Sequence, residues 1–287
     1  MERIERALEV ARLHRRRQGD AAPASVAVPA SVAVPASGIA APSFSEALAE
    51  EHATLRLDDA PAVELPAREV LRERYVVFPD DAGLATAAYK MLRAQVLQRT
   101  RQHGMRTIGI VSPASGEGKT LTAINLALSL AADPNQSVIL VDLDLRKPSV
   151  AATLGLDAER GLESYFAGVD PVEKVWRRFA SVERLVVVPT LAPVSNSSEI
   201  LAGPAAGELV RTLRGVSSDP LVLVDLPPAL LSDDVLTIAP LLDGIVLVVT
   251  AEQTRREDLQ RVFELLRSTP VIGTVLNSSA EAEARAY

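Results

Sequence analysis

The sequence predicts an α/β fold with a doubly wound, mostly parallel β-sheet and a disordered N-terminal extension. The first observation is a set of apolar runs without polar alternation, as expected for strands that are covered on both faces. They lie at residues 138–141, 185–188, 221–224, 245–249 and 271–276. The second observation is helical spacing of apolar residues between these runs, clearest at Leu259, Val262 and Leu266. Regular alternation of strands and helices is typical of a parallel sheet with helices on both sides.

Along the chain, the pattern predicts four parts. Residues 1–18 form an amphipathic helix, and residues 19–68 form a largely disordered linker with a proline-containing six-residue repeat. The α/β domain follows at 69–277, and it begins with helical spacing at Leu84, Ala88 and Met91 on the way to the first strand. Residues 278–287 form a flexible polar tail.

A glycine-rich turn follows the apolar run at 108–111 and reads VSPASGEGKT, ending at Thr120. Gly116 and Gly118 leave backbone N–H groups bare for a polyphosphate, Lys119 supplies positive charge, and the Thr120 hydroxyl suits Mg²⁺. The helical pattern after the turn aims the positive end of a helix dipole at the phosphates. The strand, loop and helix setting therefore predicts the phosphate loop of a P-loop NTPase that binds ATP and Mg²⁺.

Two predicted strands end in aspartate. The run at 138–141 continues into Asp142, Asp144 and Arg146 at alternate positions, and the run at 221–224 ends in Asp225. Ligands bind at the carboxyl ends of parallel strands, and Mg²⁺ prefers a few carboxylates together with phosphate oxygens. Arg146 either stabilises charge on a transferred phosphoryl group or forms a salt bridge to Asp142 or Asp144.

The motifs SPASGEGKT, VILVDLDLRKP and LVLVDLPP together resemble the bacterial tyrosine kinases (BY-kinases) of capsule and exopolysaccharide export. The resemblance runs from about residue 84 to residue 277 and includes SNSSEIL and GTVLN. The N-terminal ERIERALEVAR and the proline-rich linker look like the exosortase-associated branch of that family. The resemblance implies an ATP-dependent protein-tyrosine autokinase that regulates polysaccharide synthesis and export.

The resemblance also implies roles for individual residues. In catalysis we expect Lys119, Asp142, Asp144 and Arg146; at the metal we expect Thr120, Asp142 and Asp225. Tyr287 would accept the phosphoryl group. The nucleotide would contact Ser115, Gly116, Glu117, Gly118, Lys119, Thr120, Leu121 and Asn277. For Asn277 a simple turn after the last strand is the alternative.

Some positions depart from the family pattern. Ala87 stands where the family has a glutamate that joins neighbouring subunits, although Lys90 and Arg93 follow at the expected spacing, and the tail holds one tyrosine. A P-loop ATPase switch, of the kind that regulates a partitioning or membrane export assembly without tyrosine transfer, remains the alternative. Its hallmark is a second lysine early in the loop, where this chain has Ala114.

Composition limits the classes of partner. A formal net charge of -7 and a pI near 5.2 disfavour general nucleic-acid binding. The absence of cysteine excludes disulfides and thiolate metal sites. No apolar stretch reaches the roughly 20 residues of a membrane span. We expect a cytoplasmic homo-oligomer, held at the inner face of the cell membrane by a membrane-bound polysaccharide co-polymerase or chain-length regulator.

Overall fold

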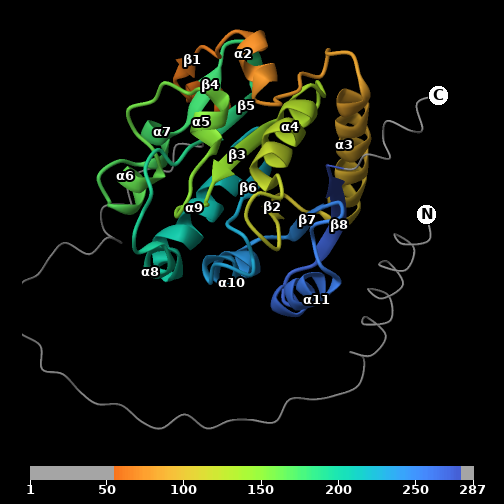
Figure 1. Ribbon diagram of the computed structural model, residues 1–287. Helices are drawn as coiled ribbons and strands as arrows, with labels where there is room; N and C mark the ends of the chain where they lie inside the picture. Colours follow the sequence, from red (N-terminus) through yellow and green to blue (C-terminus); the bar gives the residue numbers. More distant parts are fainter. Residues whose placement is uncertain (1–54, 279–287) are drawn as a thin grey trace, which may run out of the picture. The chain divides into compact units, whose positions relative to one another are not determined.

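The computed structural model describes residues 55–278, so the predicted N-terminal helix, most of the predicted linker and Tyr287 lie outside the described residues. An eight-stranded sheet forms the centre of the described unit, in the order β1-β4-β5-β3-β6-β2-β7-β8 (Figure 1). Neighbouring strands are parallel except for the β4–β5 pair. The predicted mostly parallel α/β fold is confirmed. The strands are β1 (Ala62–Val63), β2 (Thr107–Val111), β3 (Val138–Asp142), β4 (Arg177–Phe179), β5 (Val182–Val188), β6 (Leu221–Asp225), β7 (Gly244–Thr250) and β8 (Val271–Asn277).

Helices cover both faces of the sheet. On one face lie α2 (Arg68–Glu73), α3 (Leu84–His103), α4 (Lys119–Ala131) and α5 (Val150–Leu154). The other face carries α6 (Leu162–Phe166), α7 (Val172–Val175), α8 (Ser197–Ala202), α9 (Pro204–Arg214), α10 (Asp234–Ile238) and α11 (Arg256–Leu265). Two 3₁₀ turns complete the described chain, η1 (Leu57–Asp59) and η2 (Ala239–Leu241). None of the described helices is long and apolar enough to cross a membrane.

The central strands are buried on both sides because their residues feed two separate cores. In β3, Val138 and Leu140 pack toward α4, whereas Ile139 and Val141 pack toward α9. This double burial explains why the runs read as unbroken apolar segments. In β2, Gly109 is required by close packing, since an added Cβ would lie 2.7 Å from the Ile245 side chain.

Helix α4 is buried along nearly its whole length, because it packs on the sheet with α3 beside it (Figure 1). The Arg93 guanidinium on α3 donates a hydrogen bond to the Ser129 carbonyl on α4 at 2.9 Å. Arg93 is therefore engaged within its own chain, whereas Ala87 and Lys90 are exposed on the same helix.

The folded unit begins before residue 69, which corrects the predicted linker boundary. Leu57 and Ala60 are buried in the core beside α9, and β1 pairs with the edge strand β4. The segment has too few apolar residues to show a period, so the sequence pattern gave no sign of it. Its order comes from tertiary contacts rather than local propensity.

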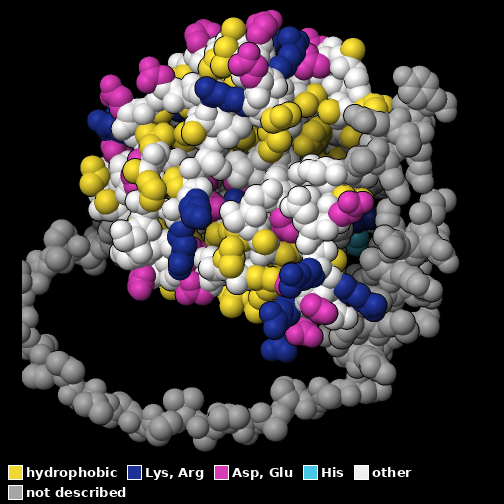
Figure 2. Space-filling model, in the orientation of Figure 1, with side chains coloured by type: hydrophobic (Ala, Val, Ile, Leu, Met, Phe, Trp, Pro, Cys, Tyr) yellow, Lys and Arg dark blue, Asp and Glu magenta, His cyan; other side chains and the backbone are white. Residues whose placement is uncertain are grey.

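Acidic and basic side chains are interspersed over the face of the molecule shown in Figure 2. This face of the described chain therefore presents no broad basic surface. The observation agrees with the negative net charge of the sequence.

Candidate active site

The loop between β2 and α4 has the shape of a phosphate cradle. Gly116 and Gly118 have φ angles of 85° and 87°, in the left-handed region that disfavours other residues. A Cβ on Gly118 would lie 2.1 Å from the Asn277 side-chain amide. That amide donates a hydrogen bond to the Glu117 carbonyl at 3.1 Å, so β8 supports the back of the loop.

Glu117 also stiffens the loop through its side chain, which is almost fully buried. One carboxylate oxygen accepts a hydrogen bond from the Ala114 backbone N–H at 2.8 Å, and the other accepts one from the Thr254 hydroxyl. Of the other two predicted loop residues, Ser115 is exposed and Leu121 is half-buried. The cradle is therefore held in shape by the protein itself.

Lys119 connects the loop to the acidic strand ends. Its Nζ lies 2.7 Å from Asp144 Oδ2 and 3.7 Å from Asp225 Oδ1. The neighbouring Thr120 hydroxyl donates a hydrogen bond to Asp225 Oδ2 at 2.6 Å. The predicted cation, hydroxyl and carboxylates thus lie together at the carboxyl edge of the sheet.

Asp142 stands beside Asp225, because the two residues are register partners on β3 and β6. Its side chain accepts three backbone N–H bonds, from Asp144 at 3.2 Å and from Ser149 and Val150 at 3.0 Å each. These bonds wrap the chain after β3 around the Asp142 carboxylate.

Burial shifts the protonation of this cluster. Burial, reinforced by the nearby Asp225 charge, raises the pKa of Asp142 well above its ordinary value. Burial also raises the pKa of Asp225 to about 6, against the opposing effects of Lys119 and Thr120. For Lys119, burial alone would lower the pKa, but the charges of Asp225 and Asp144 raise it overall. Three carboxylates, those of Asp142, Asp144 and Asp225, face one cation, Lys119. The cluster therefore favours the binding of an additional cation.

The site residues fit a magnesium ion. The buried Asp225 Oδ1 has no hydrogen-bond partner among the described residues, so a lone pair is available, and the Thr120 hydroxyl binds Oδ2 of the same carboxylate. The described residues form no cluster of three or more His, Cys, Asp or Glu side chains suited to a metal. Mg²⁺ keeps several waters and takes phosphate oxygens as ligands, so it needs few protein ligands.

The Arg146 guanidinium bonds neither Asp142 nor Asp144, so the alternative of a salt bridge to one of these residues is wrong. Its Nε lies 3.2 Å from Asp234 Oδ2, and its Nη2 lies 2.9 Å from Asp233 Oδ1. The chain turns after Asp144, and the Arg146 side chain extends toward α8 and α10.

Sequence reasoning missed Ser149. Its hydroxyl donates a hydrogen bond to Thr120 Oγ1 at 3.1 Å, and its backbone N–H binds Asp142. A signal existed, since Ser149 directly precedes α5 in the N-cap position, where serine is preferred. No sequence pattern pointed to Asp233 and Asp234.

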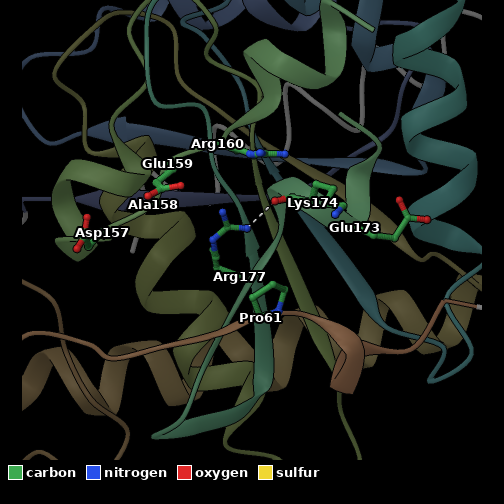
Figure 3. Close-up of a pocket in the computed structure, with 8 residues that line it drawn as sticks. All are labelled: Pro61, Asp157, Ala158, Glu159, Arg160, Glu173, Lys174 and Arg177. Atoms are coloured by element: carbon green, nitrogen blue, oxygen red, sulfur yellow. Dashed lines mark hydrogen bonds between the residues drawn. The ribbon is translucent and has the colours of Figure 1, made fainter. Parts of the chain in front are cut away.

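A separate cavity of about 420 Å³ lies near β4 and α7 (Figure 3). Three cationic and three acidic side chains line it, so opposite charges balance. It contains no residue of the phosphate loop and none of the acidic strand ends. Its lining consists of Pro61, Asp157, Ala158, Glu159, Arg160, Glu173, Lys174 and Arg177.

A model of the ParA family, described as NUBPL iron-transfer P-loop NTPase, matches residues 104–284 of this sequence. This range includes the phosphate loop, both acidic strand ends and Asn277. The chain belongs to the ParA family of P-loop NTPases.

This ParA-family chain is also similar to a curated tyrosine kinase and to a transport protein of polysaccharide biosynthesis. It is 28% identical to the tyrosine-protein kinase YwqD of Bacillus subtilis over 210 residues, which cover 72% of this chain and 86% of YwqD. It is 31% identical to the succinoglycan biosynthesis transport protein ExoP of Rhizobium meliloti over 193 residues, which cover 63% of this chain and 23% of ExoP. The chain thus spans most of YwqD but less than a quarter of ExoP.

Among solved structures, the VpsO kinase domain matches the ParA-family unit with a TM-score of 0.59 and 28% identity. The match covers 68% of this chain and 95% of that domain. The predicted resemblance to bacterial tyrosine kinases is therefore confirmed by both sequence and structure.

Proposed function

We propose that this chain is an ATP-dependent protein-tyrosine autokinase that regulates capsule or exopolysaccharide synthesis and export. The observation that carries the proposal is the cluster of Lys119, Thr120 and three carboxylates at one sheet edge. Two of these carboxylates, Asp142 and Asp144, come from the end of a single strand. The name of YwqD supports tyrosine transfer, the name of the VpsO kinase domain supports kinase activity, and that of ExoP supports a polysaccharide pathway.

ATP would bind with its phosphates in the loop at 115–121. Lys119 would have to leave Asp144 to reach the phosphate oxygens, because its Nζ lies 2.7 Å from that carboxylate in the structure. Thr120 and Asp225 would hold Mg²⁺, with Asp142 acting through a water molecule. The bound ion would neutralise charge on the phosphate oxygens.

Release of Lys119 gives Asp144 its proposed catalytic role. The phenol oxygen of tyrosine would attack the γ-phosphorus while the bond from that phosphorus to the β–γ bridging oxygen breaks, and ADP would leave with the electrons of that bond. The phenol proton would pass to Asp144 Oδ2, which binds Lys119 in the structure. The carboxylate therefore becomes available as a base only when phosphate has taken over the lysine.

The acceptor would be Tyr287 of a neighbouring copy in a homo-oligomer. The chain would act at the inner face of the cell membrane through a membrane-bound polysaccharide co-polymerase. The name of ExoP, a transport protein of polysaccharide biosynthesis, supports this class of partner.

Mass spectrometry of the purified protein tests the proposal. Wild type incubated with MgATP should gain phosphotyrosine, Lys119→Met should gain none, and Tyr287→Phe should lose most of it while still hydrolysing ATP. ATP hydrolysis without phosphotyrosine in the chain or its partner would replace the kinase by a P-loop ATPase switch.

A further inference from the structure

A network of five polar side chains joins three segments beside the active site. Arg146 follows β3, Ser197 and Ser198 begin α8, and Asp233 and Asp234 begin α10. The Arg146 Nε lies 3.1 Å from Ser197 Oγ and 3.2 Å from Asp234 Oδ2. Its Nη2 lies 2.8 Å from Ser198 Oγ and 2.9 Å from Asp233 Oδ1. The guanidinium therefore joins the segment after β3 to the starts of α8 and α10.

The network is anchored by Asp234, whose side chain is 0% exposed, compared with 46% for Arg146. Its carboxylate also accepts hydrogen bonds from Ser197 at 2.9 Å and Ser198 at 2.7 Å. Burial alone would raise the pKa of Asp234, but these hydroxyls and Arg146 lower it overall. A buried carboxylate needs such partners, and Arg146 supplies its cation.

Two of these segments carry carboxylates of the candidate active site at their other ends. Asp144 lies two residues before Arg146, and the backbone between them is fixed by a Val194 N–H bond to the Leu145 carbonyl at 2.8 Å. The chain from Asp225 to α10 is tied to the phosphate loop by an Ala229 N–H bond to the Ser112 carbonyl at 2.8 Å. Movement of either segment would shift Asp144 or Asp225 relative to Lys119.

We infer that Arg146, Ser197, Ser198, Asp233 and Asp234 form a brace that fixes the two acidic strand ends in the geometry for phosphoryl transfer. Arg146 is then a positioning residue and acts through Asp144 and Asp225. The reaction in this inference rests on the proposed function, whereas the hydrogen bonds of the brace are all observed among the described residues. The opposing role, a direct contact of Arg146 with the phosphoryl group, would require the arginine to abandon a fully buried carboxylate.

The two roles predict opposite effects for Asp234→Asn. If Arg146 contacts phosphate directly, weakening its hold on Asp234 should leave turnover unchanged or increase it. If Arg146 acts instead as part of the brace, the same change allows Asp144 and Asp225 to move from their positions. Turnover should then fall by about 10-fold to 100-fold, the loss expected for misplacement of reacting groups by about 1 Å.

The experiment measures ADP release at saturating MgATP and the KM for ATP, with melting temperature and MgADP affinity as checks on folding. Arg146→Ala and Asp234→Asn should each lower kcat while the KM stays within about 3-fold, because the phosphate loop is intact. The double variant should be no slower than the slower single variant, since both changes break one unit. Arg146→Lys, which keeps the charge but not the planar fork, should recover part of the loss.

Arg160→Ala is the matched control. Arg160 has a side-chain exposure of 49%, close to that of Arg146. Its Nη1 lies 2.5 Å from Asp170 Oδ1, and neither residue belongs to the phosphate loop. Its loss should change kcat by less than about 2-fold, as for an ordinary surface pair. Should Arg146→Ala not fold, Asp234→Asn and Arg146→Lys carry the test.

Wild-type turnover in Asp234→Asn, or multiplying losses in the double variant, would overturn the brace. A loss in Arg160→Ala as large as in Arg146→Ala would also overturn it, because the effect would then be general. ADP release needs no tyrosine acceptor. Absence of phosphotyrosine in wild type would therefore refute the kinase without removing the test of the brace.

Discussion

Asp144→Asn should raise affinity for MgATP while it slows tyrosine phosphorylation. The substitution keeps the shape of the side chain and removes the charge that lies 2.7 Å from Lys119 Nζ. At this distance, and at an effective dielectric constant of about 20, the gross attraction between the two charges is about 6 kcal/mol. The net value is smaller because both groups are buried and lose hydration.

ATP must break this contact when its phosphates take the lysine. If breaking the Lys119–Asp144 contact costs about 1.4 kcal/mol of the free energy of ATP binding, Asp144→Asn should bind ATP about 10-fold more tightly than wild type. Lys119 would still be held near the site by Asp225 Oδ1, 3.7 Å away. The loss of the proposed proton acceptor should lower phosphorylation by about 10²-fold to 10⁴-fold.

Calorimetry with a nonhydrolysable ATP analogue measures the first effect, and phosphotyrosine formation in a single turnover measures the second. Asp170→Asn is the matched control, since it removes the carboxylate of the ion pair with Arg160 outside the site. An affinity equal to or below that of wild type would refute the reasoning, and a large loss would indicate that Asp144 holds the nucleotide or its metal. Unchanged phosphorylation would refute its role as the proton acceptor.

Three further outcomes are expected. Lys119→Ala should weaken MgATP binding by about 2–5 kcal/mol, measured by calorimetry, and equal affinity would reject the phosphate site. Asp225 has a pKa of about 6 in the folded protein, above its ordinary value of 3.8. Protonation of Asp225 therefore stabilises the folded state fully below pH 3.8, and this stabilisation is lost as the pH rises through 6. Nucleotide-free protein should therefore melt about 3–5 °C lower at pH 7 than at pH 5, and Asp225→Asn should reduce this difference. Gly118→Ala should weaken ATP binding by about 10-fold or more, since its φ is 87° and the new methyl group would collide with Asn277. Gly207→Ala is the control, because its Cβ would meet nothing within 4 Å.

The fold was predictable because each central strand is buried on both faces and shows this in its composition. The helix after the phosphate loop was equally clear. The elements that the sequence did not predict are short and depend on tertiary contacts. Strand β1, for example, has two residues and forms by pairing with β4. Arg177 opens β4 and carries a charge that local pattern does not associate with a strand.

The candidate site was predictable where one motif carries both fold and chemistry. In the segment 142–146, Leu143 and Leu145 are buried in the core, while Asp142 and Asp144 bind the polar site. The alternation therefore fixes which side chains face the phosphate loop. The partners of Arg146 could not be predicted in the same way, because α8 and α10 are brought together only by folding. The sequence therefore identifies the charged residues of the site more readily than the contacts that hold them in place. Those contacts decide whether a charged residue such as Arg146 meets the substrate or supports the residues that do.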